Sequence, residues 1–313
     1  MNILITGASG YLGAKLASYF SGFHNVYVAS ISSLLNVRVD NLENTFSRSL
    51  NWGSSIEISK STEGMDVIIH AAGLNADGCQ KSIIEAYEIN VIKTAKILDS
   101  AIKNNVKQFI YLSTAHVYGE LHGKIIESAT PEPIHPYGLS KFAGEEVVKY
   151  FSRKDGKINY QILRLANVFG PPKGDNQTCW NLLVNDLCLQ AIKNAKLRLN
   201  TNGLHSRNFL TMQDFLESIA HFLKNQDMSG VYNVGTEKST TIMEMAELIS
   251  ERYYLLFGKK IYIEKNEDDK SEKNHILYDC SKLVSTGFQF TNKFSNEIDD
   301  ILKMLTILRG MKI

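Results

Sequence analysis

The stretch Asn2-Ile-Leu-Ile-Thr-Gly-Ala-Ser-Gly-Tyr-Leu-Gly13 decides the fold that we expect for this chain. Asn2 to Thr6 is short and apolar and predicts a buried strand, and Tyr11 to about Ser21 predicts a helix. Glycines stand at positions 7, 10 and 13, between the two elements and in the first turn of the helix. Such a glycine pattern, directly after a strand and opening a helix, is typical of a dinucleotide-binding turn.

Each glycine of this turn has a physical task. Gly7 permits the tight turn, Gly10 lets the backbone approach a pyrophosphate, and Gly13 lets helix and strand pack closely. The N–H groups at the start of the helix can then bind an anion. The alternative, a strand-helix turn without a ligand, is less compatible with this order and spacing. We therefore predict that a nicotinamide dinucleotide contacts Gly7, Ser9, Gly10, Tyr11, Leu12 and Gly13.

The end of the second strand bears on the choice between NAD and NADP. NAD-specific sites usually carry Asp or Glu there to bond the ribose hydroxyls. The expected strand Val26 to Ser30 ends instead on a serine, which does not repel a 2′-phosphate, and Arg38 or Lys15 could reach one. The sequence thus favours NADP, with NAD as the alternative. Arg38 could equally be a solvated surface charge.

The composition is that of a folded chain of enzyme size. The 313 residues are 44% apolar and 21% charged, which allows a large core. The 34 basic and 33 acidic side chains leave a net charge of +1, too little to attract nucleic acid or an anionic membrane. The longest apolar run, Val67 to Gly73, is too short for a membrane span. We expect a cytoplasmic protein that binds neither.

Cysteine spacing predicts neither a metal site nor a disulfide framework. Cys79, Cys179, Cys188 and Cys280 are far apart, and no C-x-x-C pair occurs. We expect reduced thiols, most of them buried.

Apolar runs alternate with helical patterns through the first half of the chain. This order predicts an α/β fold with a Rossmann-like, doubly wound parallel sheet. A break at Gly170 to Gly174 suggests a dinucleotide-binding domain at 1–170 and a smaller mixed α/β substrate lobe at 171–313, with about 205–235 returning to the first domain. The further strands are expected at 66–70, 108–113, 160–164 and 231–234, and the helices at 82–104, 137–152, 180–194, 213–225, 241–257 and 296–308.

Tyr137 and Lys141 are four positions apart and therefore share one face of the expected helix. A free phenol, with a pKa of about 10, is a poor acid-base at neutral pH. Moving that pKa to about 7 requires roughly 4 kcal/mol of preferential phenolate stabilisation, which a close ammonium and a positive nicotinamide ring can supply together. We predict that Tyr137 transfers a proton, and the alternative is an ordinary amphipathic helix.

Thr114 adds a hydroxyl to this pair. The run Ser113-Thr-Ala-His-Val-Tyr-Gly119 leaves the expected strand, so Thr114 lies at the carboxyl end of the sheet, where open α/β folds bind ligands. We predict that its hydroxyl bonds the reacting oxygen of the substrate.

These motifs, in this order, resemble the extended short-chain dehydrogenase/reductase family, which comprises NAD(P)-dependent nucleotide-sugar epimerases, dehydratases and ketoreductases. The resemblance runs nearly end to end. It is carried by the glycine turn, His70-Ala-Ala-Gly73, Asn90, Ser113 to Gly119, Tyr137 with Lys141, Arg164 to Pro171, Arg207 to Asp214, Tyr232 to Gly235 and Asp279 to Lys282.

The resemblance implies roles for further residues. It makes Thr114, Tyr137 and Lys141 catalytic and places Ala71, Ala72, Gly73 and Asn90 beside the cofactor, together with Tyr137, Lys141 and Ser30. It makes Asn167, Asn181 and Arg207 substrate residues, with Asn167 and Arg207 on the nucleotide diphosphate. The alternatives are that Asn167 caps a turn, Asn181 starts a helix and Arg207 pairs with Asp214. It also implies a homodimer through the helices at 82–104 and 137–152.

One departure from the family pattern bears on which reaction the chain is expected to catalyse. The 4,6-dehydratases carry Asp and Glu directly after the catalytic threonine, where this chain has Ala115 and His116. Elimination across the sugar ring is therefore disfavoured. His116 could contact the substrate or act as an acid-base, or it could be structural.

We predict an oxidoreductase that reduces a 4-keto nucleotide sugar, because a reductase consumes NADPH and Ser30 fits NADPH. The alternative is a nucleotide-sugar 4-epimerase that uses the same residues for oxidation and then reduction on the opposite face. A non-catalytic regulator that binds the cofactor is less compatible with Thr114, Tyr137 and Lys141 together. The resemblance also implies a role in polysaccharide biosynthesis.

Overall fold

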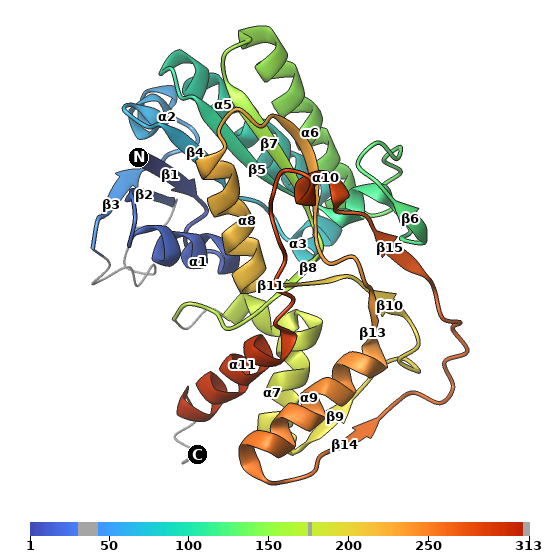
Figure 1. Cartoon of the computed structure of the whole chain (residues 1–313). Coiled ribbons are helices and arrows are strands. Elements are labelled where there is room, and N and C mark those ends of the chain that lie inside the picture. Colours follow the sequence, from blue (N-terminus) through green and yellow to red (C-terminus); the bar gives the residue numbers. More distant parts are fainter. Residues whose placement is uncertain (31–42, 175–176, 309–313) are drawn as a thin grey trace.

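A seven-stranded parallel sheet forms the centre of the molecule (Figure 1). The computed structural model describes residues 1–30, 43–174 and 177–308. The strand order is β12-β7-β5-β4-β1-β2-β3, so the order reverses between β1 and β4. This confirms the predicted Rossmann-like doubly wound sheet and places a ligand crevice at the carboxyl ends of β1 and β4. The strands are β1 (Asn2–Thr6), β2 (Asn25–Ser30), β3 (Thr45–Ser49), β4 (Val67–His70), β5 (Gln108–Thr114), β7 (Asn159–Leu165) and β12 (Gly230–Val234).

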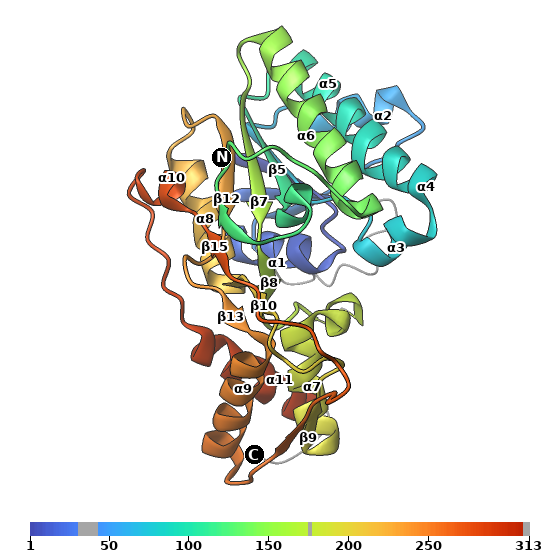
Figure 2. The ribbon, with the colours of Figure 1, turned by 90° about the vertical axis from the view of Figure 1, so that its right-hand side faces the viewer.

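Helices cover both faces of this sheet (Figures 1 and 2). On one face α1 (Tyr11–Phe20) and α8 (Met212–Lys224) pack against Ile3 and Ile5. On the other, α2 (Ser55–Thr62), α5 (Lys93–Lys103) and α6 (Pro136–Asp155) pack against Leu4 and Ile68. Because successive side chains of a strand point to opposite faces, the run at β1 serves both cores.

The predicted helix at 82–104 is interrupted. It consists of α4 (Ile83–Tyr87), a π-helical turn η2 (Glu88–Ile92) and α5. Short α3 (Ala76–Lys81) precedes it. A π-turn carries one extra residue per turn and is common at functional positions, and here it contains Asn90, which is buried. A 3.6-residue apolar pattern does not reveal such an insertion.

The edge strand β3 and the helix α2 are among the elements of the first half that the sequence analysis did not predict. The edge strand β3 has the sequence Thr-Phe-Ser-Arg-Ser and is mostly solvent-exposed, so it lacks the apolar run of the central strands. The helix α2 is short and polar, and Ser54 caps it by accepting a hydrogen bond from the Glu57 N–H. Sheet pairing with β2 and packing on α5 stabilise these segments, and neither interaction is local in sequence.

A second core lies below the sheet, between α7 (Leu183–Asn194), α9 (Ile242–Phe257) and α11 (Phe294–Leu308) (Figure 2). The predicted helix at 180–194 is a 3₁₀ turn, η4 (Gln177–Asn181), followed by α7. The remaining elements are η3 (Ala115–Tyr118), α10 (Ser281–Val284) and the paired short strands β6 (Gly123–Ile125) with β15 (Ile276–Tyr278), β8 (Asn167–Phe169) with β11 (Phe209–Thr211), β9 (Lys196–Arg198) with β14 (Tyr262–Glu264), and β10 (Ser206–Arg207) with β13 (Thr240–Thr241).

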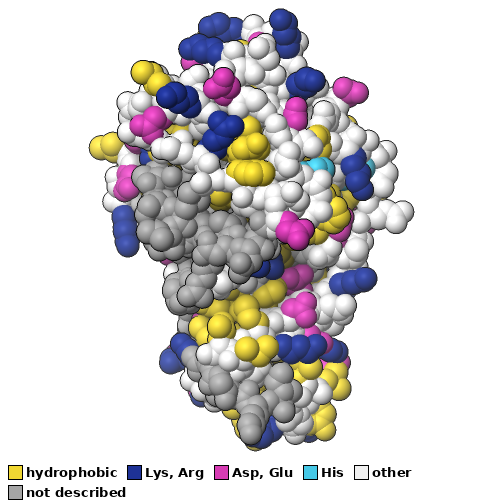
Figure 3. All heavy atoms as spheres, turned by 90° about the vertical axis from the view of Figure 1, so that its left-hand side faces the viewer, with side chains coloured by type: hydrophobic (Ala, Val, Ile, Leu, Met, Phe, Trp, Pro, Cys, Tyr) yellow, Lys and Arg dark blue, Asp and Glu magenta, His cyan; other side chains and the backbone are white. Residues whose placement is uncertain are grey.

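Charge and thiols agree with the composition. On the face drawn in Figure 3, basic and acidic side chains are interspersed. The four cysteines are buried, as predicted. No helix within the described ranges has the length and apolar character needed to cross a membrane.

Candidate active site

The glycine turn leaves bare backbone at the carboxyl end of β1. Gly7 has a φ of 72°, and a Cβ on it would lie 2.5 Å from the Ala72 nitrogen. A Cβ on Gly13 would overlap the Gly7 carbonyl oxygen. α1 begins after Gly10 with no side-chain cap and no acidic residue in its first turn. Its N–H groups and dipole therefore suit a bound anion, which is the fit that a dinucleotide pyrophosphate requires.

The segment after β4 lies next to this turn. Thr6 Oγ1 is 2.8 Å from His70 Nδ1 and accepts a hydrogen bond from the Ala72 N–H. His70 Nε2 is 3.0 Å from Thr94 Oγ1. Burial lowers the pKa of His70 to about 3, so the ring is neutral and acts as a structural link between β1 and α5. Ala71, Ala72 and Gly73 are thereby fixed beside Gly7.

Asn90 connects the same segment to α6. Its Oδ1 accepts a hydrogen bond from the Leu74 N–H at 2.8 Å, and its Nδ2 donates to Ser140 Oγ at 2.9 Å. A Cβ on Gly73 would stand 3.1 Å from Asn90 Oδ1 and 3.9 Å from Lys141 Nζ. The cofactor residues that the resemblance implied after β4 thus lie against the lysine of the predicted catalytic group.

Thr114, Tyr137 and Lys141 are brought together where β5 meets the start of α6. Thr114 is the last residue of β5, and its side chain acts on that of Tyr137, where it lowers the pKa of the phenol against the effect of burial. Thr114 Oγ1 also accepts a hydrogen bond from the His116 N–H at 3.2 Å. Lys141, one turn further along α6, is only 4% exposed. A hydroxyl, a phenol and a buried amine at one point can move a proton to or from a substrate oxygen.

Burial raises the pKa of Tyr137 to about 12 in the protein on its own, whereas the sequence predicted a value lowered by Lys141 and the nicotinamide ring together. Burial is the largest cause of this rise, and the Thr114 side chain acts in the opposite direction. Burial lowers the pKa of Lys141 itself to about 7, so its positive charge is incomplete at neutral pH. Its Nζ also lies 4.1 Å from the centre of the Tyr111 ring. Sequence spacing reveals a shared helix face but not this burial.

Close packing of α6 on β5 fixes the geometry. A Cβ on Gly144 would overlap the Tyr111 hydroxyl, and one on Gly138 would overlap the His116 carbonyl oxygen. The sequence analysis did not single out these glycines. They could have been found as glycines in a helix whose other side chains are mostly long. Such glycines often mark a place where the helix packs closely on another segment.

Two of the predicted substrate residues, His116 and Arg207, lie near Tyr137 or act on a neighbour of it. The His116 ring lies edge-on to Tyr137 with ring centres 6.2 Å apart, and its pKa is lowered by burial and then by the charges of Arg207 and His135. Arg207 is on β10, paired with Thr240. The alternative partner for Arg207, Asp214, instead accepts hydrogen bonds from Thr291 and Asn292. Tyr137, His116 and Arg207 therefore share one electrostatic environment.

Three other predicted residues have less direct placements. Asn167 donates from Nδ2 to the Asn208 carbonyl at 2.7 Å, next to Arg207. Asn181 is exposed at the end of η4, and since Leu182 precedes the first residue of α7, Asn181 does not start that helix. Ser30 ends β2 at the same edge of the sheet as Thr6. Arg38 lies outside the described residues.

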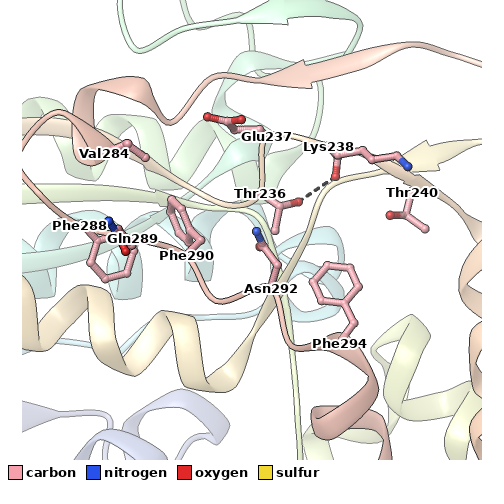
Figure 4. Close-up of a pocket in the computed structure, with 10 residues that line it drawn as sticks. All are labelled: Thr236, Glu237, Lys238, Thr240, Val284, Phe288, Gln289, Phe290, Asn292 and Phe294. Atoms are coloured by element: carbon pink, nitrogen blue, oxygen red, sulfur yellow. Dashed lines mark hydrogen bonds between the residues drawn. The ribbon is translucent and has the colours of Figure 1, made fainter.

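A separate pocket of about 600 Å³ opens between the segment after β12 and the segment joining α10 to α11 (Figure 4). Phe288, Phe290 and Phe294 line it together with polar side chains such as Thr236 and Asn292. None of the predicted site residues belongs to its lining. Among the described residues, no group of three or more His, Cys, Asp or Glu side chains could hold a metal ion.

Comparison with known proteins gives consistent relatives. Residues 3–235 match the NAD dependent epimerase/dehydratase family. The chain is 27% identical, over 92% of both chains, to a putative UDP-glucose 4-epimerase of Methanocaldococcus jannaschii. It is 24% identical, over 90% of both chains, to an uncharacterized UDP-glucose epimerase of Bacillus subtilis.

Solved structures share the fold over nearly the whole chain. A UDP-N-acetylglucosamine 4-epimerase from Methanobrevibacter ruminantium, in complex with UDP-N-acetylmuramic acid, superposes with a TM-score of 0.85 at 24% identity, covering 99% of both chains. A UDP-glucuronic acid 4-epimerase from Bacillus cereus, in complex with UDP-glucuronic acid and NAD, has a TM-score of 0.83 at 21% identity, covering 98% of this chain and 100% of that one. The chain belongs to the NAD dependent epimerase/dehydratase family and is an enzyme of the extended short-chain dehydrogenase/reductase type.

Proposed function

We propose that the protein is an NAD-dependent nucleotide-sugar 4-epimerase. The observation that carries the proposal is the action of Thr114 on Tyr137, one helical turn from Lys141, whose amine lies near Gly73 in the segment that packs on the dinucleotide turn. The named relatives are UDP-sugar epimerases, which supports the epimerase alternative from the sequence over the reductase that the sequence favoured first. Ala115 and His116 replace the carboxylates that a dehydratase uses.

The residues present fit a nicotinamide dinucleotide. The pyrophosphate would lie on the bare backbone of Gly7 to Gly13, and the nicotinamide half would extend toward Gly73 and Lys141, where a Cβ on Gly73 would make a tight contact with Asn90. The bound cofactor supplies a hydride acceptor and, afterwards, a hydride donor. The complex of a structural neighbour with NAD supports NAD over NADP as the physiological cofactor.

Tyr137 and Thr114 act on the 4-oxygen of the sugar. Tyr137 Oη accepts the proton of the 4-hydroxyl as the sugar is oxidised and returns it as the sugar is reduced on the other face. Lys141 stabilises the Tyr137 phenolate before it accepts this proton and again after it returns it, and Thr114 donates a hydrogen bond to the 4-oxygen. Rotation of the 4-keto sugar between the two steps requires that binding energy come mainly from the nucleotide. Asn167 and Arg207 would hold its diphosphate, because a guanidinium matches phosphate oxygens.

One assay tests the proposal directly. The purified protein is incubated with NAD and, separately, NADPH, against a panel of UDP-sugars and 4-keto nucleotide sugars, and products and absorbance at 340 nm are followed. We expect interconversion of the 4-epimers of a UDP-sugar without net loss of cofactor. Stoichiometric consumption of NADPH with a 4-keto sugar would instead establish a reductase, and cofactor binding without turnover of any sugar would favour the regulator.

We also propose the domain division and the homodimer that the sequence implied. In this division 1–170 binds the cofactor and 171–313 shapes the sugar pocket, while β12 and α8 return to the main sheet. Ile84 on α4 is 82% exposed, and Leu139 and Tyr150 on α6 are also exposed. Both elements belong to the two helical segments through which dimerisation is expected, and burying such side chains stabilises an interface.

Replacing Ile84 by glutamate should convert the dimer to a monomer. A charge at the centre of an apolar interface is desolvated without a partner, so we expect the dimer dissociation constant to rise at least about 100-fold. Size-exclusion chromatography with light scattering measures this. Ile56→Glu is the matched control, since Ile56 is 67% exposed but lies on α2. Equal effects of both substitutions would contradict the proposed interface.

A further inference from the structure

Glu145 is a fully buried carboxylate directly behind the proposed catalytic group. It lies on α6, one helical turn after Lys141, and has no exposed surface. Ser113 Oγ donates a hydrogen bond to its Oε1 at 2.5 Å. Ser113 is the residue that precedes Thr114 on β5. One carboxylate therefore contacts the strand that carries Thr114 and shares the helix that carries Tyr137 and Lys141.

Arg164 compensates the charge of this carboxylate. Its Nη2 lies 2.7 Å from Glu145 Oε2 and its Nε 3.1 Å from Oε1, a two-pronged ion pair with the arginine only 2% exposed. Arg164 pairs with Ser113 in register between β7 and β5. Its guanidinium also donates to the Glu127 carbonyl at 3.2 Å and lies 4.6 Å from the centre of the Tyr118 ring. The pair thus joins α6 to two central strands.

Few other charges surround the Lys141 ammonium. Glu145 acts on it from α6, the Cys79 thiol from α3, the Tyr111 ring from β5, and the neutral His70 from β4. Asn90 is near it on η2. Glu145 is the only carboxylate among the groups that act on Lys141 in the described part of the chain. Burial disfavours the ammonium, and Glu145 is the main group that opposes this effect.

We propose that Glu145 is a positioning residue that keeps Lys141 in its charged form and holds α6 against β5, so that Tyr137 meets Thr114. The proposal rests on the proposed function in taking Tyr137 and Lys141 as the proton-transferring pair. Arg164 supplies the compensating charge without which a carboxylate at this depth would be costly. A phenolate formed on Tyr137 is stabilised only by a lysine that is charged, so the carboxylate acts on the reaction through Lys141.

The competing explanation is that the Glu145–Arg164 pair only holds the fold together. A buried ion pair often adds little to the free energy of unfolding, but removing only one partner is strongly destabilising because the other charge stays buried without compensation. The two explanations predict different effects of replacing Glu145 on the pH at which Lys141 titrates. NMR of protein labelled with ¹³C at the lysine Cε atoms follows this titration, and the signal that is missing from Lys141→Met is that of Lys141. A purely structural carboxylate would leave that titration in place in any variant that folds.

Glu145→Gln should move the Lys141 titration to lower pH by about one unit, because it removes the buried carboxylate whose charge raises the pKa of Lys141. The wild-type value is about 7, so at pH 7 the charged fraction falls from about one half to about one tenth. Epimerisation at pH 7 should fall roughly fivefold for this reason alone. In the pH profile of epimerisation, activity should decline as Lys141 loses its proton. In Glu145→Gln this decline should occur at a lower pH, by the same amount as the Lys141 titration moves.

Glu146→Gln is the matched control. Glu146 is the next residue on the same helix, half-exposed and paired with Lys149 at 2.7 Å, and its loss should leave the Lys141 titration unchanged. Glu145→Gln leaves the Arg164 guanidinium buried without a compensating charge. If this variant does not fold, the double variant Glu145→Gln/Arg164→Met is used for the titration instead. The double variant should regain stability and keep the lowered Lys141 titration.

A Lys141 titration at its wild-type position in folded Glu145→Gln or in the double variant would overturn the proposal. The NMR titration needs no turnover. A wild-type protein that epimerises no sugar would therefore count against the proposed function, while the titration would still decide whether Glu145 holds the charge of Lys141.

Discussion

Tyr137→Phe is expected to lower kcat for epimerisation about 10³-fold, since a positioned acid-base group contributes about 10²- to 10⁴-fold. The substitution removes only the hydroxyl, on which the Thr114 side chain acts. The ring keeps its place against His116, so packing should be preserved. KM should change little, because binding energy is expected from the nucleotide rather than from the reacting oxygen. Initial rates of 4-epimer formation measure both constants.

Tyr150→Phe is the control for this substitution. Tyr150 lies on the same helix and is 55% exposed, away from Thr114, so its hydroxyl should be dispensable. Both variants should bind NAD with the wild-type dissociation constant, measured by titration calorimetry. If Tyr137→Phe turned over at more than about a tenth of the wild-type rate, another group would have to move the proton, and His116 would be the next to replace.

The parts of the fold that the sequence predicted are those set by local chemistry. The turn from Gly7 to Gly13 could be located because it needs glycine at fixed positions, and the strand ending at Thr114 because its apolar run is continuous. Parallel pairing of β1 with β4 and of β4 with β5 then brings the end of that strand to the same edge of the sheet as Thr6. The catalytic group could be proposed for the same reason, since four residues of helix place Tyr137 and Lys141 on one face.

What the sequence did not predict depends on contacts between distant segments. Glu145 and Arg164 meet only because α6 crosses β7, and no spacing rule links a helix residue to a buried strand arginine. The signal available was an arginine within the apolar run Ile-Leu-Arg-Leu, which requires a buried partner. The sequence likewise did not reveal the burial of Tyr137 and Lys141, which raises the pKa of Tyr137 and lowers that of Lys141.

The second large effect is expected from Gly7→Ala. Gly7 has a φ of 72°, which costs an alanine about 1 kcal/mol. A Cβ would also stand 2.5 Å from the Ala72 nitrogen, which is backbone and cannot rotate away. Overpacking of this kind costs about 1 to 3 kcal/mol more. The free energy of unfolding should therefore fall by about 3 kcal/mol, as measured by urea denaturation.

Gly156→Ala separates the two contributions. Gly156 ends α6 with a φ of 70°, and a Cβ there would meet no atom within 4 Å. It should therefore lose only the conformational part, about 1 kcal/mol, and bind NAD normally. Gly7→Ala must separate β1 from the segment after β4, which displaces the backbone that would cradle the pyrophosphate. We expect its dissociation constant for NAD to rise at least about 100-fold, equivalent to about 2.7 kcal/mol. Unchanged NAD affinity in a folded Gly7→Ala protein would show that the cofactor does not lie on this turn, and the assignment of Ala72 and Gly73 to the cofactor would fail with it.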